Sequence, residues 1–207
     1  MALGTQIRSF DSPYTEPRGL SFDERALFQA SVAVNLFMQL DTKAARLIRS
    51  GGTPGPQPRA ARFDGRSLFN TDTTNDRTRQ MGLRDFEMIR GVDSPGGSIT
   101  DMDLDGRASY MVDSADDLLA LVSRGSTAIR TAASPAANPV AMAFDGRSTW
   151  IFDSGSDLAY QVDPRTGTVI RSGSFPTSTG GAGMAFDGRA FWFQENTTGD
   201  VYQVSVT

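Results

Sequence analysis

The sequence contains neither cysteine nor histidine. Without cysteine the chain can form neither disulfide bonds nor thiolate metal sites. Without histidine it lacks the commonest general base and the commonest zinc ligand, and it cannot contain a Ser-His-Asp triad. These two absences exclude several frequent kinds of catalytic and metal site. We therefore expect no bound metal and no cofactor.

Lysine is almost absent as well, because Lys43 is the single lysine among 20 basic residues. The chain carries 24 acidic residues, and its formal net charge at pH 7 is −4. An acidic balance gives no electrostatic reason to expect nucleic acid as a partner. Lys43 lies in no glycine-rich motif, so the sequence contains no phosphate-binding loop.

Long hydrophobic runs are also missing. No stretch approaches the roughly 20 apolar residues of a membrane-spanning helix, so we expect no membrane insertion. The first eight residues have neither a basic segment nor an apolar segment, and we therefore expect no signal peptide. The expected location is a virion or the cytoplasm.

A short motif recurs along the chain at a spacing of about 41 residues, which is typical of a repeat protein. The motif Phe-Asp-Gly-Arg stands at Phe63–Arg66, Phe144–Arg147 and Phe186–Arg189, with variants at Phe22–Arg25 and Leu104–Arg107. An Asp-Gly pair between two alternating or apolar runs is a strong β-hairpin signal, because glycine accepts a positive φ at no steric cost. Each copy therefore predicts a strand, a tight turn and a second strand.

The fourth repeat shows the complete unit. Its expected strands are Val140–Phe144, Ser148–Phe152, Leu158–Asp163 and Thr168–Ser172. Four short antiparallel strands per repeat are typical of a β-propeller blade. We predict an all-β protein, a five-bladed β-propeller forming a single domain over residues 1–207. The expected blades cover about residues 17–52, 58–93, 98–134, 139–175, and 181–207 together with 4–10.

The two ends of the chain complement each other. The last repeat stops after its third strand, at Asp200–Val206, while Gly4–Ser9 match the fourth strand of the other repeats. The N-terminal strand is therefore predicted to complete the last blade and close the ring. We expect Ile7 to be buried like Ile48 and Ile170, contributing roughly 1.5–3 kcal/mol. A β-sandwich, the alternative fold, gives no reason for this match.

On these motifs the chain resembles bacterial and viral propeller repeats of the NHL-like type. Their units read as an apolar residue and Phe-Asp-Gly, then an Asp-rich loop, then Tyr-x-Val-Asp-Pro-x-Thr-Gly, which Phe144–Gly167 match nearly throughout. The repeats are similar to those of streptogramin lyases, but that resemblance implies a catalytic histidine, which this chain lacks. Five-bladed rings also resemble sugar-binding lectins of the tachylectin type and glycosidases of the arabinanase type.

The second strand of every blade carries an aromatic residue at the same position. These residues are Phe28, Phe69, Tyr110, Trp150 and Trp192. Tyr110, Trp150 and Trp192 are candidate sugar-stacking residues of a lectin. The alternative, which we favour, is that these rings fill the space between blades.

Acidic residues follow the second strand in four blades, and Asp113, Asp153 and Glu195 are the candidate partners for sugar hydroxyl groups. The alternative is that these carboxylates stabilise turns through the local backbone, and this alternative is the stronger one. No loop has the Asp-x-Asp-x-Asp pattern of a calcium site.

Three charged residues, Arg62, Asp101 and Asp103, stand on the inner strands among small side chains. A glycosidase needs two carboxylates that converge on one point. An Arg62–Asp103 charge pair between adjacent blades is the simpler interpretation. We therefore predict that the protein is not an enzyme.

Two departures from the repeat suggest a surface for a protein partner. The second blade has Arg77, Arg79 and Arg84 in and around its third strand, and the first blade has the apolar loop Val32, Ala33 and Val34. We predict contacts with neighbouring subunits of a larger assembly through these six residues. The expected function is a non-enzymatic structural module of a virion, on a bacteriophage capsid surface or tail. The alternative is a lectin that binds glycans between its blades.

Overall fold

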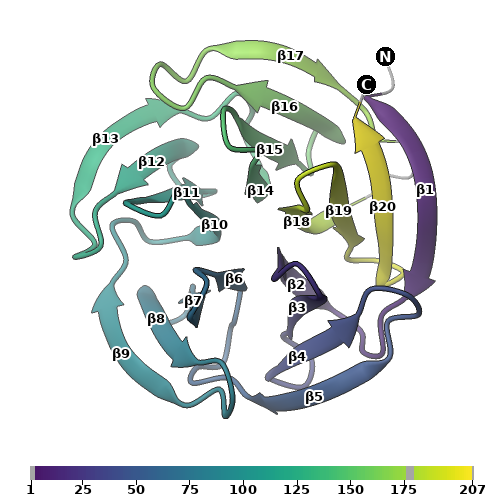
Figure 1. Cartoon of the computed structure of the whole chain (residues 1–207). Coiled ribbons are helices and arrows are strands. Elements are labelled where there is room, and N and C mark those ends of the chain that lie inside the picture. Colours follow the sequence, from purple (N-terminus) through teal and green to yellow (C-terminus); the bar gives the residue numbers. More distant parts are fainter. Residues whose placement is uncertain (1–2, 176–179, 207) are drawn as a thin grey trace.

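The computed structural model of the protein describes residues 3–175 and 180–206, and within them it consists of strands and turns without a helix. The strands form five antiparallel sheets of four strands each, arranged around a common centre (Figure 1). The predicted all-β, five-bladed propeller is therefore confirmed. No helix within the described residues is long and apolar enough to cross a membrane.

Each of the first four blades is built from four consecutive strands, which run from the centre to the rim. Blade 1 contains β2 (Pro17–Phe22), β3 (Ala26–Ser31), β4 (Leu36–Asp41) and β5 (Leu47–Gly52). Blade 2 contains β6 (Arg62–Phe63), β7 (Ser67–Asp72), β8 (Arg77–Gly82) and β9 (Met88–Asp93). Blade 3 contains β10 (Ile99–Leu104), β11 (Ser109–Asp113), β12 (Leu118–Val122) and β13 (Ala128–Ala133). Blade 4 contains β14 (Pro139–Phe144), β15 (Thr149–Asp153), β16 (Leu158–Val162) and β17 (Val169–Gly173).

Blade 5 is assembled from both ends of the chain. It contains β18 (Gly181–Phe186), β19 (Ala190–Glu195), β20 (Asp200–Val206) and, as its outer strand, β1 (Gly4–Asp11). The pairing of β1 with β20 runs from Gly4 opposite Val206 to Asp11 opposite Asp200, and the two strands lie side by side in Figure 1. The predicted closure of the ring by the N-terminal strand is therefore confirmed.

The Asp-Gly motifs form the turns between the first and second strands of the blades. In blade 2, Gly65 has a φ of 94°, and the Asp64 Oδ1 atom accepts hydrogen bonds from the backbone N–H groups of Arg66 and Ser67. Asp145 makes the equivalent bonds to Arg147 and Ser148 in blade 4. One carboxylate oxygen therefore holds the turn, and the other is available for a second contact.

The core is divided among the spaces between blades. Trp150 packs with Phe191 of the next blade, and Trp192 packs with Leu27 and Leu40 of blade 1. Both indole rings are 1 % exposed. The large rings of the second strands therefore supply much of the packing between neighbouring blades.

The expectation that Ile7 is buried is wrong. Ile7, Ile48 and Ile170 are each more than half exposed, as are their equivalents Ile89 and Ile129. These residues lie on the outer strands, where neighbouring blades diverge (Figure 1). Along these strands side chains alternate between the two sheet faces. The arginine that follows each isoleucine makes the contacts with neighbouring elements, as Arg8 does with Gln203 and the Thr42 carbonyl.

Candidate functional site

The centre of the ring is occupied by the side chain of Arg62. Its guanidinium group donates hydrogen bonds to the backbone carbonyl groups of equivalent residues in each of the other four blades, namely Leu20, Met102, Met142 and Met184. Arg62 also forms ion pairs with Asp101, at 3.1 Å, and with Asp103, at 3.8 Å. One side chain therefore ties all five inner strands together.

Asp101 is fully buried beside Arg62. Burial raises the pKa of Asp101 to about 7, against the opposing effect of the Arg62 charge. Its oxygens accept hydrogen bonds from the backbone N–H groups of Met102 and Met142. Asp103 likewise accepts from the N–H groups of Leu104 and Phe144. Both carboxylates are therefore engaged in holding the ring, and they do not form the convergent pair of a glycosidase.

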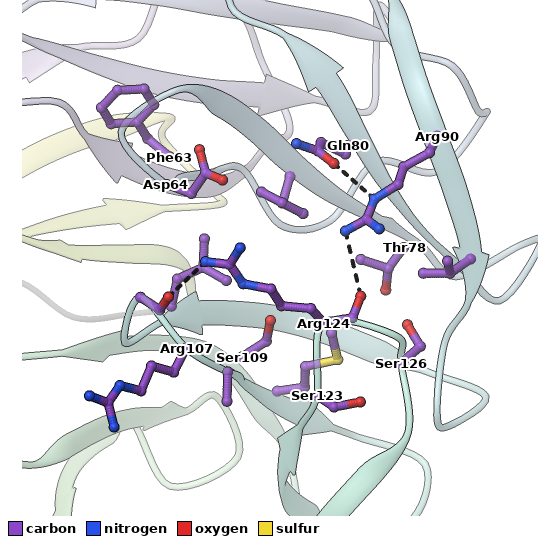
Figure 2. Close-up of a pocket in the computed structure, with 16 residues that line it drawn as sticks. Phe63, Asp64, Thr78, Gln80, Arg90, Arg107, Ser109, Ser123, Arg124 and Ser126 are labelled. Atoms are coloured by element: carbon purple, nitrogen blue, oxygen red, sulfur yellow. Dashed lines mark hydrogen bonds between the residues drawn. The ribbon is translucent and has the colours of Figure 1, made fainter.

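A pocket of about 360 Å³ lies between blades 2 and 3 (Figure 2). This volume falls within the range of about 300–1,000 Å³ that is usual for small-molecule sites. Its apolar wall includes Phe63, Phe69, Leu104 and Met111. Its polar wall includes Asp64 and Arg90 from blade 2 and Ser109, Ser126 and Arg124 from blade 3.

Two positions of the repeat beside the pocket carry small residues in blade 3, as they also do in blade 4, where Thr149 and Gly167 stand. Ser109 takes the place that Leu27, Leu68 and Phe191 occupy in other blades. Ser126, which has a positive φ in the turn after β12, takes the place of Phe86 in blade 2. Between blades 1 and 2 the Phe86 ring is buried against Phe37. Between blades 2 and 3, Ser126 stands in place of such a ring, and the pocket occupies the corresponding space.

Three arginines line the pocket, and within the described residues none of them forms an ion pair with a carboxylate. Arg90 donates to the Gln80 side chain at 2.8 Å and to the Arg124 carbonyl at 3.5 Å. Arg124 donates to the Gly106 carbonyl at 2.8 Å. Because a guanidinium group has five N–H donors, Arg90 and Arg124 both retain unused ones. Arg107 lies at the rim, and its side chain extends away from Arg124 (Figure 2).

Asp64 contributes an acceptor to the same pocket. Its Oδ1 atom holds the turn, whereas its Oδ2 atom accepts no hydrogen bond from any residue that the structure describes. Asp64 and Arg124 extend from opposite walls (Figure 2). The pocket thus combines an apolar floor, two cationic groups and one free carboxylate oxygen.

The structure buries the candidate sugar-stacking residues. Trp150 and Trp192 are 1 % exposed and Tyr110 is 7 % exposed. The indole nitrogens donate to Asp145 and Asp187 within the same blades. This placement favours the alternative in which these rings fill the core between blades.

The candidate acidic partners of a sugar are buried as well. The carboxylates of Asp113 and Asp153 accept backbone N–H groups of the turns that follow them. Glu195 accepts a hydrogen bond from the Thr198 hydroxyl group at 2.8 Å. These contacts match the turn-stabilising alternative. Within the described chain, no three acidic side chains lie close enough together to hold a metal ion.

The six predicted partner-binding residues do not form one surface. Val32, Ala33, Val34 and Arg77 lie in or beside the turns between the second and third strands. Arg84 lies in the turn after β8, at the opposite end of the blade. Arg79 is buried and forms an ion pair with Asp72 at 2.7 Å. Arg77 forms an ion pair with Asp93, and Arg84 is exposed.

Sequence reasoning missed the pocket between blades 2 and 3. Phe69 was grouped with the other rings, and Ser109, Arg90 and Arg124 were not singled out. A signal was nevertheless present in the aligned repeats, where Ser109 replaces a large apolar residue of three other blades. A small residue at a position that is large and apolar in three other blades could have indicated the site.

No family model matches the sequence, and no curated protein matches it either. The fold is similar to that of a glutaminyl cyclase from Myxococcus xanthus, with a TM-score of 0.84 over 99 % of this chain and 97 % of that chain, at 14 % identity. A hydrazine synthase from Kuenenia stuttgartiensis matches with a TM-score of 0.59 at 16 % identity, over 89 % of this chain and 57 % of that chain. A virginiamycin B lyase from Staphylococcus aureus matches with a TM-score of 0.58 at 13 % identity, over 95 % and 68 % of the two chains.

These identities establish a likeness of fold. The five-bladed architecture is supported by the comparison, whereas the NHL-like repeat type stays a prediction. The prediction that the protein is not an enzyme is contradicted by the comparison, because a structure that matches this chain over 99 % of its length is that of an enzyme, a glutaminyl cyclase, at 14 % identity. The absence of histidine and of convergent carboxylates does not by itself exclude catalysis.

Proposed function

We propose that the protein binds a small organic acid in the pocket between blades 2 and 3. The observation that carries this proposal is the pair Arg90 and Arg124, which line the pocket and form no ion pair with a carboxylate among the described residues. A carboxylate or phosphate group accepts hydrogen bonds from such groups in a favourable planar geometry. Binding of such a ligand is a step that receptors and enzymes share.

The apolar wall sets the second requirement on the ligand. Phe69 is only partly buried, and together with the partly buried Phe63 and Leu104 it offers a surface for the flat or aliphatic part of a ligand. Burying the apolar part of the ligand stabilises the complex by roughly 25 cal/mol per Å² of apolar surface. The ligand is therefore an amphipathic acid, with its anionic group at the arginines and its apolar part against Phe69.

The first prediction is tested by titration calorimetry with indole-3-acetate and with its neutral primary amide. We expect the acid to bind at least about tenfold more tightly than the amide, because a hydrogen bond to a charged group contributes about 1.5–3 kcal/mol. The variant Ser109→Leu restores the side chain of other blades and should abolish binding while the protein stays folded. Arg124→Gln should weaken binding about tenfold.

Arg165 provides a matched control, because it occupies the equivalent turn of blade 4 and is exposed away from the pocket. Arg165→Gln should leave the affinity unchanged. Equal binding of the acid and the amide, or equal losses in both arginine variants, would contradict the proposal. A glycan panel measured in the same way tests the lectin hypothesis, since glycan binding that survives Ser109→Leu would require another site.

A second candidate is glutaminyl cyclase activity, which is favoured by the likeness of fold over 99 % of this chain. The variant Ser109→Leu locates any such activity. Loss of activity in this variant would place the reaction in the pocket between blades 2 and 3, and retention would place it elsewhere in the protein. The absence of activity in the wild-type protein would remove this candidate.

A further inference from the structure

Blade 4 contains a set of four side chains that repeats around the ring. The Trp150 Nε1–H group donates to Asp145 Oδ2 at 2.8 Å. The Arg171 guanidinium carbon lies 5.1 Å from the centroid of the same indole ring, and Arg171 donates to the Gln161 side chain. The indole therefore has its N–H group on a carboxylate and one face beneath a guanidinium group.

Blade 5 contains the same arrangement. Trp192 Nε1–H donates to Asp187 Oδ2 at 2.9 Å. The Arg8 guanidinium carbon lies 5.0 Å from the Trp192 ring centroid, and Arg8 donates to Gln203. In both blades, an aspartate, a glutamine and an arginine therefore surround an indole ring in the same way.

Blades 1 and 2 both have the same aspartate, glutamine and arginine, but a phenylalanine, Phe28 or Phe69, in place of the tryptophan. In blade 1 the Phe86 ring lies over Arg49 instead, 5.3 Å from its guanidinium carbon.

In blade 2, Asp64, Gln80 and Arg90 occupy the equivalent positions, and the Arg90–Gln80 hydrogen bond is retained at 2.8 Å. Phe69 stands in place of tryptophan and has no N–H group to donate. Asp64 Oδ2 is consequently unpaired within the described chain, and Arg90 lies over no aromatic ring there.

The pocket opens beside this incomplete set, because Ser109 provides no large side chain from blade 3. Asp64 is more exposed than Asp145 or Asp187, and Phe69 is more exposed than the two tryptophans. Asp64, with its unpaired carboxylate oxygen, and Arg90, with its uncovered guanidinium group, line the same cavity (Figure 2). The partly exposed Phe69 ring lines it as well.

We infer that the ligand of this pocket is an acid built on a planar nitrogen heterocycle, whose ring N–H group donates to Asp64 Oδ2 and whose ring lies against Arg90. This inference rests on the proposed function and names the chemical class of its ligand. Indole carboxylates are the simplest members of the class. Arg124, on the opposite wall, is placed to bind the acidic group while Asp64 binds the ring nitrogen (Figure 2).

Asp64 allows the pocket to discriminate between acids whose apolar rings have the same shape. A ring without an N–H group leaves the Asp64 carboxylate facing an apolar surface, which costs the free energy of desolvating an unpaired charged acceptor. An N-methylated ring adds a clash at the same place. An acid with an N–H group therefore binds better than an isostere without one, although both satisfy the arginines.

The test compares indole-3-acetate with 1-methylindole-3-acetate by titration calorimetry. We expect the wild-type protein to prefer the N–H compound by at least about tenfold. Asp64→Asn retains one oxygen for the turn and places an NH₂ group toward the pocket, so it should remove the preference. Asp23→Asn makes the same change in the equivalent turn of blade 1, where Asp23 accepts from Arg25 and Ala26, and it should keep the preference.

The outcomes separate this inference from the proposed function. Equal affinity for the two acids, with a loss in Arg124→Gln, would overturn the inference and leave organic-acid binding intact. Tighter binding of L-phenylalanine than of indole-3-acetate would also overturn it, because an ammonium group would then be the donor to Asp64. Absence of binding by every acid would overturn both.

Discussion

Arg62 illustrates how one residue can set the architecture around it. Its guanidinium group is buried and is satisfied by four backbone carbonyl groups and by Asp101, with Asp103 close by. A buried charge is tolerated when it is paired and hydrogen-bonded in this way. The sequence identified Arg62 and its aspartates as exceptions among small inner residues, but the contacts to four blades depend on the closed ring. They could not be inferred from an Arg62–Asp103 pair alone.

The pH dependence of stability tests the role of Asp101. Burial raises its pKa to about 7 in the folded protein, whereas an unfolded aspartate has a pKa near 3.9. The folded protein therefore holds this proton more tightly than the unfolded chain. The resulting stabilisation is fully present below about pH 4 and is lost as the pH rises through 7.

We therefore expect the free energy of unfolding of the wild-type protein to fall between pH 5 and pH 8, by up to about 1.4 kcal/mol per pH unit for this one group. Urea unfolding at both pH values measures the change. Asp101→Asn should flatten the dependence, and Asp23→Asn, which alters an exposed turn, should not. An equally steep fall in wild type and Asp101→Asn would show that Asp101 does not bind the proton.

At the scale of elements, β1 is the strand that depends on the whole ring. It pairs with β20 across nearly the full length of the chain, and Arg8 connects it to Gln203 and to the Thr42 carbonyl of blade 1. Matching repeats predicted this pairing correctly. The same match predicted a buried Ile7 wrongly, because a repeated position shows which residues are equivalent and not which way their side chains face.

Deletion of residues 1–11 should give an aggregating or poorly folded protein, because β20 would become an unpaired edge strand. Size-exclusion chromatography and far-UV circular dichroism measure the outcome. Ile7→Thr should change the free energy of unfolding by less than about 0.5 kcal/mol, since this side chain is 55 % exposed. A monomeric deletion variant that unfolds cooperatively would contradict the closure role of β1.

At the scale of the whole molecule, the five blades share one four-stranded topology and differ in how their interfaces are filled. The repeat made the fold predictable, because the Asp-Gly turns and the strand pattern recur at a constant spacing. The candidate site was not predictable in the same way. It depends on the size of Ser109 and Ser126 opposite Phe69 and Arg90, and these residues meet only when blades 2 and 3 pack together.

The central claim is that the pocket lies beside an incomplete copy of the Asp–Trp–Arg arrangement of blades 4 and 5. A crystal structure of the Phe69→Trp variant tests it most directly. We predict that the N–H group of the introduced indole donates to Asp64 Oδ2, that the indole ring lies beneath Arg90, and that the pocket is reduced in volume. An indole turned away from Asp64, with the pocket unchanged, would contradict the account.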